Sequence, residues 1–204
     1  MAQSGNKQKY ESKNPIQRAL IDHFLGQVVR LVEKVRPTRI LDVGCGEGFV
    51  LDRLARAGVE AELYGLDMSA SAVTEARARL GDRARIEVGD ARTPPFDEPF
   101  DLVLMTEVLE HIPNPEDMLP VLDRLAREHL ILSVPWEPFF MGLNFLRGKN
   151  LSRFGNDPEH VNHWGRRGFR RFVGRRFDVV DAPLAFPWTL VLARKRPAPD
   201  VPSA

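Results

Sequence analysis

The segment RILDVGCGEG, residues 39–48, decides the fold of this chain. It places a short, mostly apolar run before three glycines in the spacing G-x-G-x-G. Residues 49–57 follow with helical patterning that stops at Gly58. A strand, a glycine loop and a helix in this order form a ligand-binding unit of open α/β sheets, because glycines let the backbone turn sharply and let a ligand come close. We therefore expect residues 39–43 to form a buried strand with a ligand beyond its carboxyl end.

Strands and helices alternate on both sides of this unit. Short apolar runs predict strands at 62–66, 85–88, 101–105 and 129–134, and a closing pair at 177–182 and 188–194. Helical patterning covers 15–36, 69–80 with Ser69 as cap and Gly81 at its end, 115–128 with Pro120 as an interruption, and 168–175. Such alternation is typical of a mostly parallel sheet with helices on both faces. The predicted fold class is therefore α/β, Rossmann-like and doubly wound.

Length and composition predict one folded domain. The chain has 204 residues, 43% hydrophobic and 28% charged, which is close to ordinary globular composition. We expect flexible tails at 1–14 and 197–204 and a single domain at 15–196, within which 135–176 forms a substrate-side insertion or lid. One cysteine, a polar start and the lack of a long apolar run predict a cytoplasmic protein without a membrane span.

Basic and acidic residues are nearly equal in number, but they are concentrated in different segments of the chain. Lys plus Arg number 29 and Asp plus Glu 28, so net charge gives no argument for nucleic-acid binding. Residues 101–137 contain eight acidic and two basic residues, whereas 147–176 contain nine basic and two acidic ones. Two interpretations stay open. The segments are solvated faces of opposite sign that meet in the fold, or the basic one forms a rim for an anionic substrate.

The charges beside the glycine loop indicate its ligand. The spacing differs from the G-x-G-x-x-G of dinucleotide sites and lacks the Lys-Ser/Thr of a phosphate loop. Asp42 and Glu47 flank the loop, and one such carboxylate at ~4 Å would repel a phosphate charge by about 4 kcal/mol at an effective dielectric of ~20. The same carboxylates suit an ammonium group, and Asp67 after the second strand can accept both hydroxyls of a ribose. The combination indicates S-adenosylmethionine instead of NAD.

Four ordered motifs resemble those of class I S-adenosylmethionine-dependent methyltransferases of types 11 and 12. They are residues 40–48, Leu66-Asp67, 89–91 and 101–112. The resemblance implies a seven-stranded sheet with an antiparallel last strand and S-adenosyl-L-methionine as cofactor. It implies a cofactor-binding set made of Asp42, Gly44, Cys45, Gly46, Gly48, Asp67, Met68, Asp90, Ala91, Thr106 and Glu107.

The resemblance also implies a role for parts of this set. The three glycines border the methionine part of the cofactor, and Asp42 helps hold its amino group. Asp67 takes the ribose hydroxyls, Asp90 with Ala91 faces the adenine, and Thr106 or Glu107 lies near the methionine end. Cys45 is interpreted as a small filler of the loop and not as a nucleophile, because no partner base is evident.

The motif E-x-x-E-H after the fourth strand consists of Glu107, Glu110 and His111. If the stretch is helical, these side chains share one face, and two carboxylates with an imidazole can hold Mg²⁺ or Mn²⁺. The motif resembles both ubiquinone-pathway O-methyltransferases and small-RNA 2′-O-methyltransferases, and the second resemblance adds His160 as a ligand. Three interpretations stay open: a metal site, a catalytic role for His111 and Glu110, or a structural role.

The predicted activity is transfer of a methyl group to a small-molecule acceptor, at an oxygen of an apolar or aromatic compound. The apolar stretch 135–146 forms either a wall for that acceptor or a cover of the core. Alternatives are an RNA 2′-O-methyltransferase with a divalent metal, a nicotinamide-dependent oxidoreductase, and a binding module without activity. Nucleic acid is the less favoured partner because no base-stacking platform is visible, and the sequence leaves the oligomeric state open.

Overall fold

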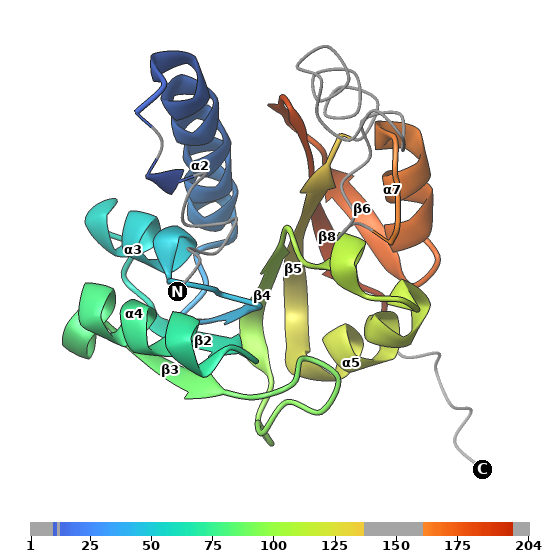
Figure 1. The fold of residues 1–204 in the computed structure, drawn as a ribbon. Coiled ribbons are helices and arrows are strands. Elements are labelled where there is room, and N and C mark those ends of the chain that lie inside the picture. The colour runs from blue at the N-terminus through green and yellow to red at the C-terminus, as the bar shows by residue number, and fades with distance from the viewer. Residues whose placement is uncertain (1–9, 12, 137–160, 198–204) are drawn as a thin grey trace.

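A computed structural model describes residues 10, 11, 13–136 and 161–197, and Figure 1 draws the fold as a ribbon. Eight strands form one sheet in the order β3-β2-β1-β4-β5-β8-β6, with β7 paired to β8. The strands are β1 Arg39–Val43, β2 Glu62–Asp67, β3 Ala84–Val88, β4 Phe100–Thr106, β5 Ala126–Pro135, β6 Phe177–Asp181, β7 Leu184–Ala185 and β8 Trp188–Lys195. The first five strands pair with one another in parallel, whereas β8 is antiparallel to β5, β6 and β7. The predicted doubly wound sheet with antiparallel closing strands is confirmed.

Helices cover both faces of the sheet. They are α2 Pro15–Val35, α3 Phe49–Arg56, α4 Ala70–Leu80, α5 Met118–Leu125 and α7 Arg166–Val173, with 3₁₀ turns η1 Gly81–Arg83, η2 Leu109–His111 and η3 Pro115–Asp117. In Figure 1, α2, α3 and α4 lie to the left of the sheet, and α5 and α7 lie to its right. The buried side chains accordingly divide into two clusters, one packed by α2, α3 and α4 and the other by α5 and α7.

Alternation along β4 explains why both faces need covering. Leu102 and Leu104 belong to the cluster beneath α2, whereas Val103 and Met105 belong to the cluster beneath α5 and α7. All four are fully buried, and each such side chain contributes about 1.5–3 kcal/mol when it leaves water. A central strand that is apolar at four successive positions, 102–105, therefore requires a helical layer on each side.

The helix predicted at 115–128 is wrong at both ends. Residues 115–117 form the 3₁₀ turn η3, and the α-helix proper, α5, spans only Met118–Leu125. Pro120 is the third residue of α5, where the N–H has no intrahelical acceptor, so its missing donor costs nothing. Residues 126–128 extend β5, which begins earlier than predicted because its first residue pairs with Phe100.

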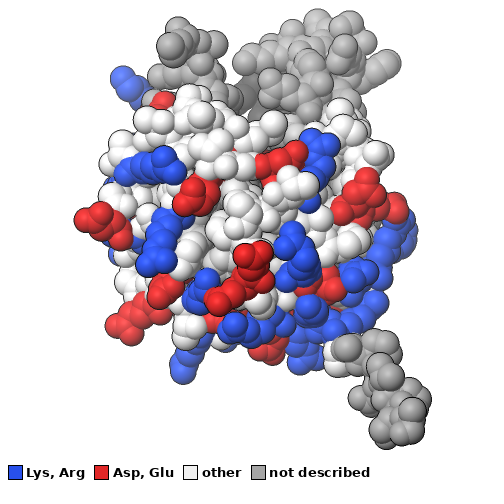
Figure 2. Space-filling view, turned by 90° about the horizontal axis from the view of Figure 1, so that it is seen from below, with Lys and Arg blue, Asp and Glu red and all other residues white. Residues whose placement is uncertain are grey.

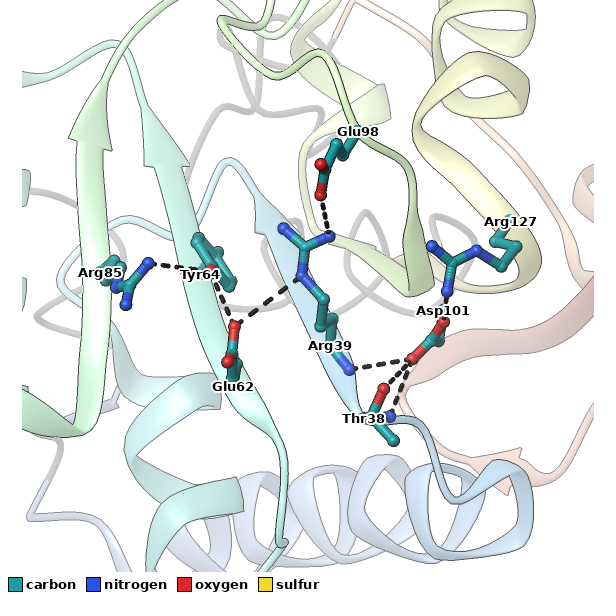
Figure 3. A network of polar contacts seen from close by, with 8 residues as sticks. All are labelled: Thr38, Arg39, Glu62, Tyr64, Arg85, Glu98, Asp101 and Arg127. Carbon is teal, nitrogen blue, oxygen red and sulfur yellow. Dashed lines mark hydrogen bonds and ion pairs between the residues drawn. The ribbon is translucent and has the colours of Figure 1, made fainter.

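The amino ends of the strands are fastened by a polar network (Figure 3). Asp101 at the start of β4 accepts hydrogen bonds from Thr38 N and Oγ1 and from Arg39 N, and it forms an ion pair with Arg127. Burial alone would raise the pKa of Asp101, but these donors and the Arg127 charge lower it below its ordinary value.

The molecule seen from below carries Lys and Arg interspersed with Asp and Glu (Figure 2). This end stabilises the sheet, and ligands are therefore expected at the opposite, carboxyl end.

Within the described residues, no helix combines the length and the apolar character that crossing a bilayer requires.

Candidate active site

The glycine loop at the end of β1 has a backbone that other residues adopt only with strain. Gly44, Gly46 and Gly48 have φ values of 78°, 52° and 79°. A Cβ added to Gly44 would lie 2.4 Å from Val108 Cγ2, and one added to Gly48 would lie 2.9 Å from Leu80 Cδ1. The left-handed backbone and the close packing together explain why the loop needs glycine at these positions.

Asp67 at the end of β2 is held by two backbone donors. Gly46 N donates to one carboxylate oxygen at 2.8 Å, and Ser69 N donates to the other at 2.9 Å. Each carboxylate oxygen retains a further lone pair, so both can still accept a hydroxyl from a ligand. The carboxylate is thus fixed beside the glycine loop in an orientation that suits two neighbouring hydroxyls.

Asp42 on β1 is buried beside this loop, and its carboxylate has no hydrogen-bond partner among the described residues. Its side chain is 1% exposed, and neither carboxylate oxygen accepts a hydrogen bond within the described part of the chain. Burial, followed by the negative charge of Asp67, raises the pKa of Asp42 to about 7. A buried carboxylate without a partner is costly, so a cationic ligand group at this position would be strongly favoured.

Cys45 is packed as part of the core. Burial, and then the nearby Asp42 and Asp67, raise the pKa of its thiol far above the ordinary value. A Cβ added to Gly65 on β2 would lie 2.8 Å from Cys45 Sγ, so the sulfur occupies the space that this glycine leaves. A protonated, enclosed thiol is a poor nucleophile.

Two further members of the predicted set lie past β3, next to Asp67. Gly89 N donates to Asp67 O at 2.9 Å, which brings the half-buried Asp90 and Ala91 to the same edge of the sheet. Asp90 accepts from Arg92 N at 2.8 Å, and this hydrogen bond is the main cause that lowers the pKa of Asp90. Met68, directly after Asp67, is 76% exposed. The exposed, apolar side chain of Met68, next to the Asp67 carboxylate, is suited to packing against a flat ring of a ligand.

Glu107, the residue after β4, forms hydrogen bonds to both β5 and β8. Its backbone is left-handed with φ 60°, its N donates to Ser133 O at 3.1 Å, and its carboxylate accepts from Trp188 Nε1 at 2.6 Å. Trp188 opens β8 and packs against Phe24 of α2 at 5.0 Å between ring centroids. Sequence reasoning missed Trp188, since no local pattern connects it to Glu107.

The expected helical face of E-x-x-E-H is not formed. The left-handed Glu107 interrupts the backbone, and only Leu109–His111 forms a short 3₁₀ turn. Glu110 is 1% exposed whereas His111 is exposed, so the two side chains enter different environments. No group of three or more His, Cys, Asp and Glu side chains that could hold a metal occurs among the described residues, and His160 lies outside them. The described residues therefore do not fit the Mg²⁺ or Mn²⁺ site considered from the sequence.

A groove of about 620 Å³ lies beside this turn, between residues 113–117 and 162–175. The acidic and basic segments are joined by two ion pairs: Arg175 pairs with Glu116, and both line the groove, whereas Arg176 and Asp123 pair at 2.7 Å outside its lining. The four arginines of α7 have no ion pair within the described residues. Within the described residues, the basic segment is thus partly neutralised by the acidic one, and the arginines of α7 stay outside this pairing. The apolar stretch from residue 137 to 146 lies outside the described residues.

Comparison with known sequences identifies residues 40–128 as a methyltransferase domain. The ubiquinone biosynthesis O-methyltransferase of Alkalilimnicola ehrlichii is 35% identical over 116 residues, which are 53% of this chain and 46% of that protein. The protein of the same name from Pectobacterium carotovorum is 30% identical over 158 residues, 69% of this chain and 65% of that protein. The chain therefore spans about half to two thirds of the length of these curated relatives.

Solved structures agree with the fold over nearly the whole chain. Magnesium protoporphyrin IX methyltransferase from Synechocystis, solved with bound SAH, has a TM-score of 0.71 at 21% identity and covers 93% of this chain and 92% of that one. The methyltransferase domain of bacterial CtHen1 has a TM-score of 0.64 at 22% identity and covers 86% of this chain and 99% of that one. The matching domain, the curated relatives and the glycine loop agree on one family. Together these findings support a class I S-adenosylmethionine-dependent methyltransferase.

Proposed function

We propose that this chain transfers a methyl group from S-adenosyl-L-methionine to an oxygen of a small apolar or aromatic molecule. The observation that supports it most is Asp42, a buried carboxylate with no partner within the described residues, beside a glycine loop and the doubly accepting Asp67. A ligand that carries a ribose and a cationic tail, and no pyrophosphate, satisfies all three features.

The donor set fits this cofactor. Asp42 would hold the ammonium group, directly or through water, and Asp67 would accept the ribose hydroxyls. Asp90, Ala91 and the exposed Met68 would border the adenine. When bound, the cofactor supplies a methyl group on a positively charged sulfur, which is a strong electrophile. The residues of the chain then act mainly by orientation, which contributes about 7–11 kcal/mol in well-aligned reactions.

The turn after β4 supplies the groups that would act on the acceptor. Its exposed His111 can take a proton from a hydroxyl, and the buried Glu110 precedes it in the same turn. Transfer to oxygen follows from the relatives, which are named O-methyltransferases. His111 and Glu110 are therefore our candidates for the catalytic groups.

The alternative functions find no support. The RNA hypothesis drew on a metal-like cluster that included Glu107, Glu110 and His111, and the described residues do not bring these side chains to one helical face. The nicotinamide hypothesis required tolerance of a pyrophosphate, which the buried Asp42 opposes. The cytoplasmic location and the domain bounds expected from the sequence stay predictions.

Calorimetric titration with S-adenosylmethionine, S-adenosylhomocysteine and NAD tests the cofactor. We expect binding of the two sulfur compounds and not of NAD. Transfer of a radiolabelled methyl group to a panel of catechols, phenols and short RNAs then tests the acceptor class. Retention of NAD alone, or methylation confined to RNA, would overturn the proposal.

A further inference from the structure

We propose that Asn162 is a positioning residue, which fixes the turn that carries Glu110 and His111. The inference rests on the proposed function, because it concerns the groups that we assign to the acceptor side. Asn162 lies just before α7, and its side chain is half-buried against residues 109–112. Neither the sequence motif nor the family resemblance assigned it a role.

Four hydrogen bonds join this segment to the turn. Asn162 Nδ2 donates to Leu109 O at 3.2 Å and to Ile112 O at 2.5 Å. The backbone N–H groups of Val161 and Asn162 both donate to Glu110 O, at 2.9 and 3.1 Å. Three of the four carbonyl oxygens of residues 109–112 are therefore bound by two residues about fifty positions later in the chain.

Within the described residues, the turn forms two backbone hydrogen bonds of its own. Its own backbone bonds are His111 N to Val108 O at 3.0 Å and Ile112 N to Leu109 O at 3.3 Å. A single 3₁₀ turn has poorer hydrogen-bond geometry than an α-helix and rarely extends further. Polar backbone groups that leave water need partners, and here the partners come from Asn162 and Val161.

The chemistry of the two contacts requires an amide side chain. The Nδ2 group has two N–H donors, and each of them meets one carbonyl oxygen. Aspartate has no donor when ionised, and its oxygens would face two carbonyl oxygens. Leucine has nearly the same shape but would leave both carbonyls unsatisfied.

Fixing the turn matters for catalysis because orientation is the main contribution that this chain makes. A displacement of about 1 Å in a catalytic group can reduce the rate by about 100-fold. The Asn162 side chain donates to backbone oxygens on both sides of Glu110 and His111. These hydrogen bonds do not involve the side chains of Glu110 and His111. Its expected effect is therefore on turnover and not on cofactor binding.

The test compares Asn162→Asp and Asn162→Leu with Asn114→Asp in the full chain. Asn114 is exposed and makes no side-chain hydrogen bond within the described residues, so it controls for the added charge in the same region. With the best acceptor of the panel, we expect kcat to fall at least 30-fold in both Asn162 variants. The Kd for S-adenosylhomocysteine should stay within twofold of wild type in both Asn162 variants and in Asn114→Asp.

A double-mutant cycle separates positioning from general destabilisation. If Asn162 acts through the turn, Asn162→Leu should cost little further turnover once His111→Ala is present. A loss that adds fully to the loss from His111→Ala, or a change in KM alone, would overturn the inference. Asn162→Gln retains the donors and should recover part of the activity, which keeps the test valid if the aspartate variant folds poorly.

Amide hydrogen exchange provides a readout that needs no acceptor. In the chain with S-adenosylhomocysteine bound, exchange at His111 and Ile112 should quicken about tenfold in Asn162→Leu and not in Asn114→Asp. Unchanged exchange would overturn the inference even if the protein binds its cofactor. Failure of the wild-type chain to bind the cofactor would instead refute the proposed function.

Discussion

The two halves of the site are held in place differently. On the cofactor side, Asp67 is fixed by Gly46 and Ser69, which belong to the loops at the ends of β1 and β2. On the acceptor side, the turn after β4 is bound by Asn162, 53 positions from Leu109, and Glu107, between this turn and the cofactor half, is bound by Trp188, 81 positions away. The cofactor half is thus built within two successive βα units, whereas the acceptor half depends on the closing segments of the chain.

This difference predicts that damage should be separable. A change in the first two βα units should weaken cofactor binding while the turn after β4 stays intact. A change in residues 161–197 should impair the acceptor half while cofactor affinity persists. The variants below test that division, from the largest expected effect to the smallest.

Asp67→Asn should have the largest effect. The amide would retain one acceptor for Gly46 or Ser69 but would lose the charge that favours the ribose hydroxyls. Hydrogen bonds to a charged group are worth about 1.5–3 kcal/mol each, so two of them predict a loss of about 100-fold or more in cofactor affinity. Calorimetry with S-adenosylhomocysteine measures it. Asp82→Asn, an exposed acid on η1, is the control, and equal affinities in the two variants would contradict the assignment.

The strands and loops that carry the cofactor half are also the part of the fold that the sequence predicted well. Strand ends, glycine positions and the acids at 42, 67 and 90 follow one another in the motif, and parallel strands bring their carboxyl ends to one edge. The acceptor half was predicted poorly for a physical reason. Whether E-x-x-E-H forms a helix depends on Glu107, whose left-handed backbone is held by a tryptophan from β8. Similarly, Pro120 looked like an interruption because the sequence does not reveal that α5 begins only at Met118.

Asp42→Asn should change how stability depends on pH. The pKa of Asp42 is raised from 3.8 to about 7, so the folded chain keeps this proton at pH values where the unfolded chain has lost it. Stability from this group therefore falls as pH rises from about 4 to about 7. The change between pH 5 and pH 8 amounts to about 3 kcal/mol, since one pKa unit is worth about 1.4 kcal/mol. Urea unfolding at the two pH values should show that decline in wild type and a smaller one in Asp42→Asn.

Cofactor binding should depend on Asp42 in the opposite direction. The ionised carboxylate is the form that attracts an ammonium group, so wild-type affinity should rise between pH 5.5 and pH 7.5. Asp42→Asn should bind more weakly and with less dependence on pH. Parallel pH profiles for the two proteins would show that another group governs binding.

Trp188→Phe should weaken the acceptor half by a moderate amount. The phenyl ring keeps most of the packing on Phe24 but loses the Nε1–H that donates to Glu107 at 2.6 Å. A hydrogen bond to a charged group predicts a loss of about 2 kcal/mol in the free energy of unfolding. Trp136→Phe is the matched control, because that indole contacts Phe186 through its ring and its side chain makes no hydrogen bond within the described residues. Cofactor affinity should change less than in Asp67→Asn, and an equal loss in both tryptophan variants would contradict the role of the Nε1–H group.

Arg175→Gln should have the smallest effect, and it separates the two interpretations of the basic segment. Arg175 pairs with Glu116 across the groove, whereas Arg171 of α7, one turn earlier, has no ion pair within the described residues. Exposed ion pairs contribute about 0.2–1 kcal/mol, so Arg175→Gln should lower the free energy of unfolding by up to that amount in low salt and by less in 0.5 M NaCl. Arg171→Gln should leave stability unchanged at both salt concentrations.

If the arginines of α7 form a rim for an anionic acceptor, Arg171→Gln should raise KM for anionic members of the panel. It should do so without changing KM for neutral ones. A rise shared by neutral acceptors would contradict a rim for anions, because a guanidinium also contacts neutral aromatic rings by stacking.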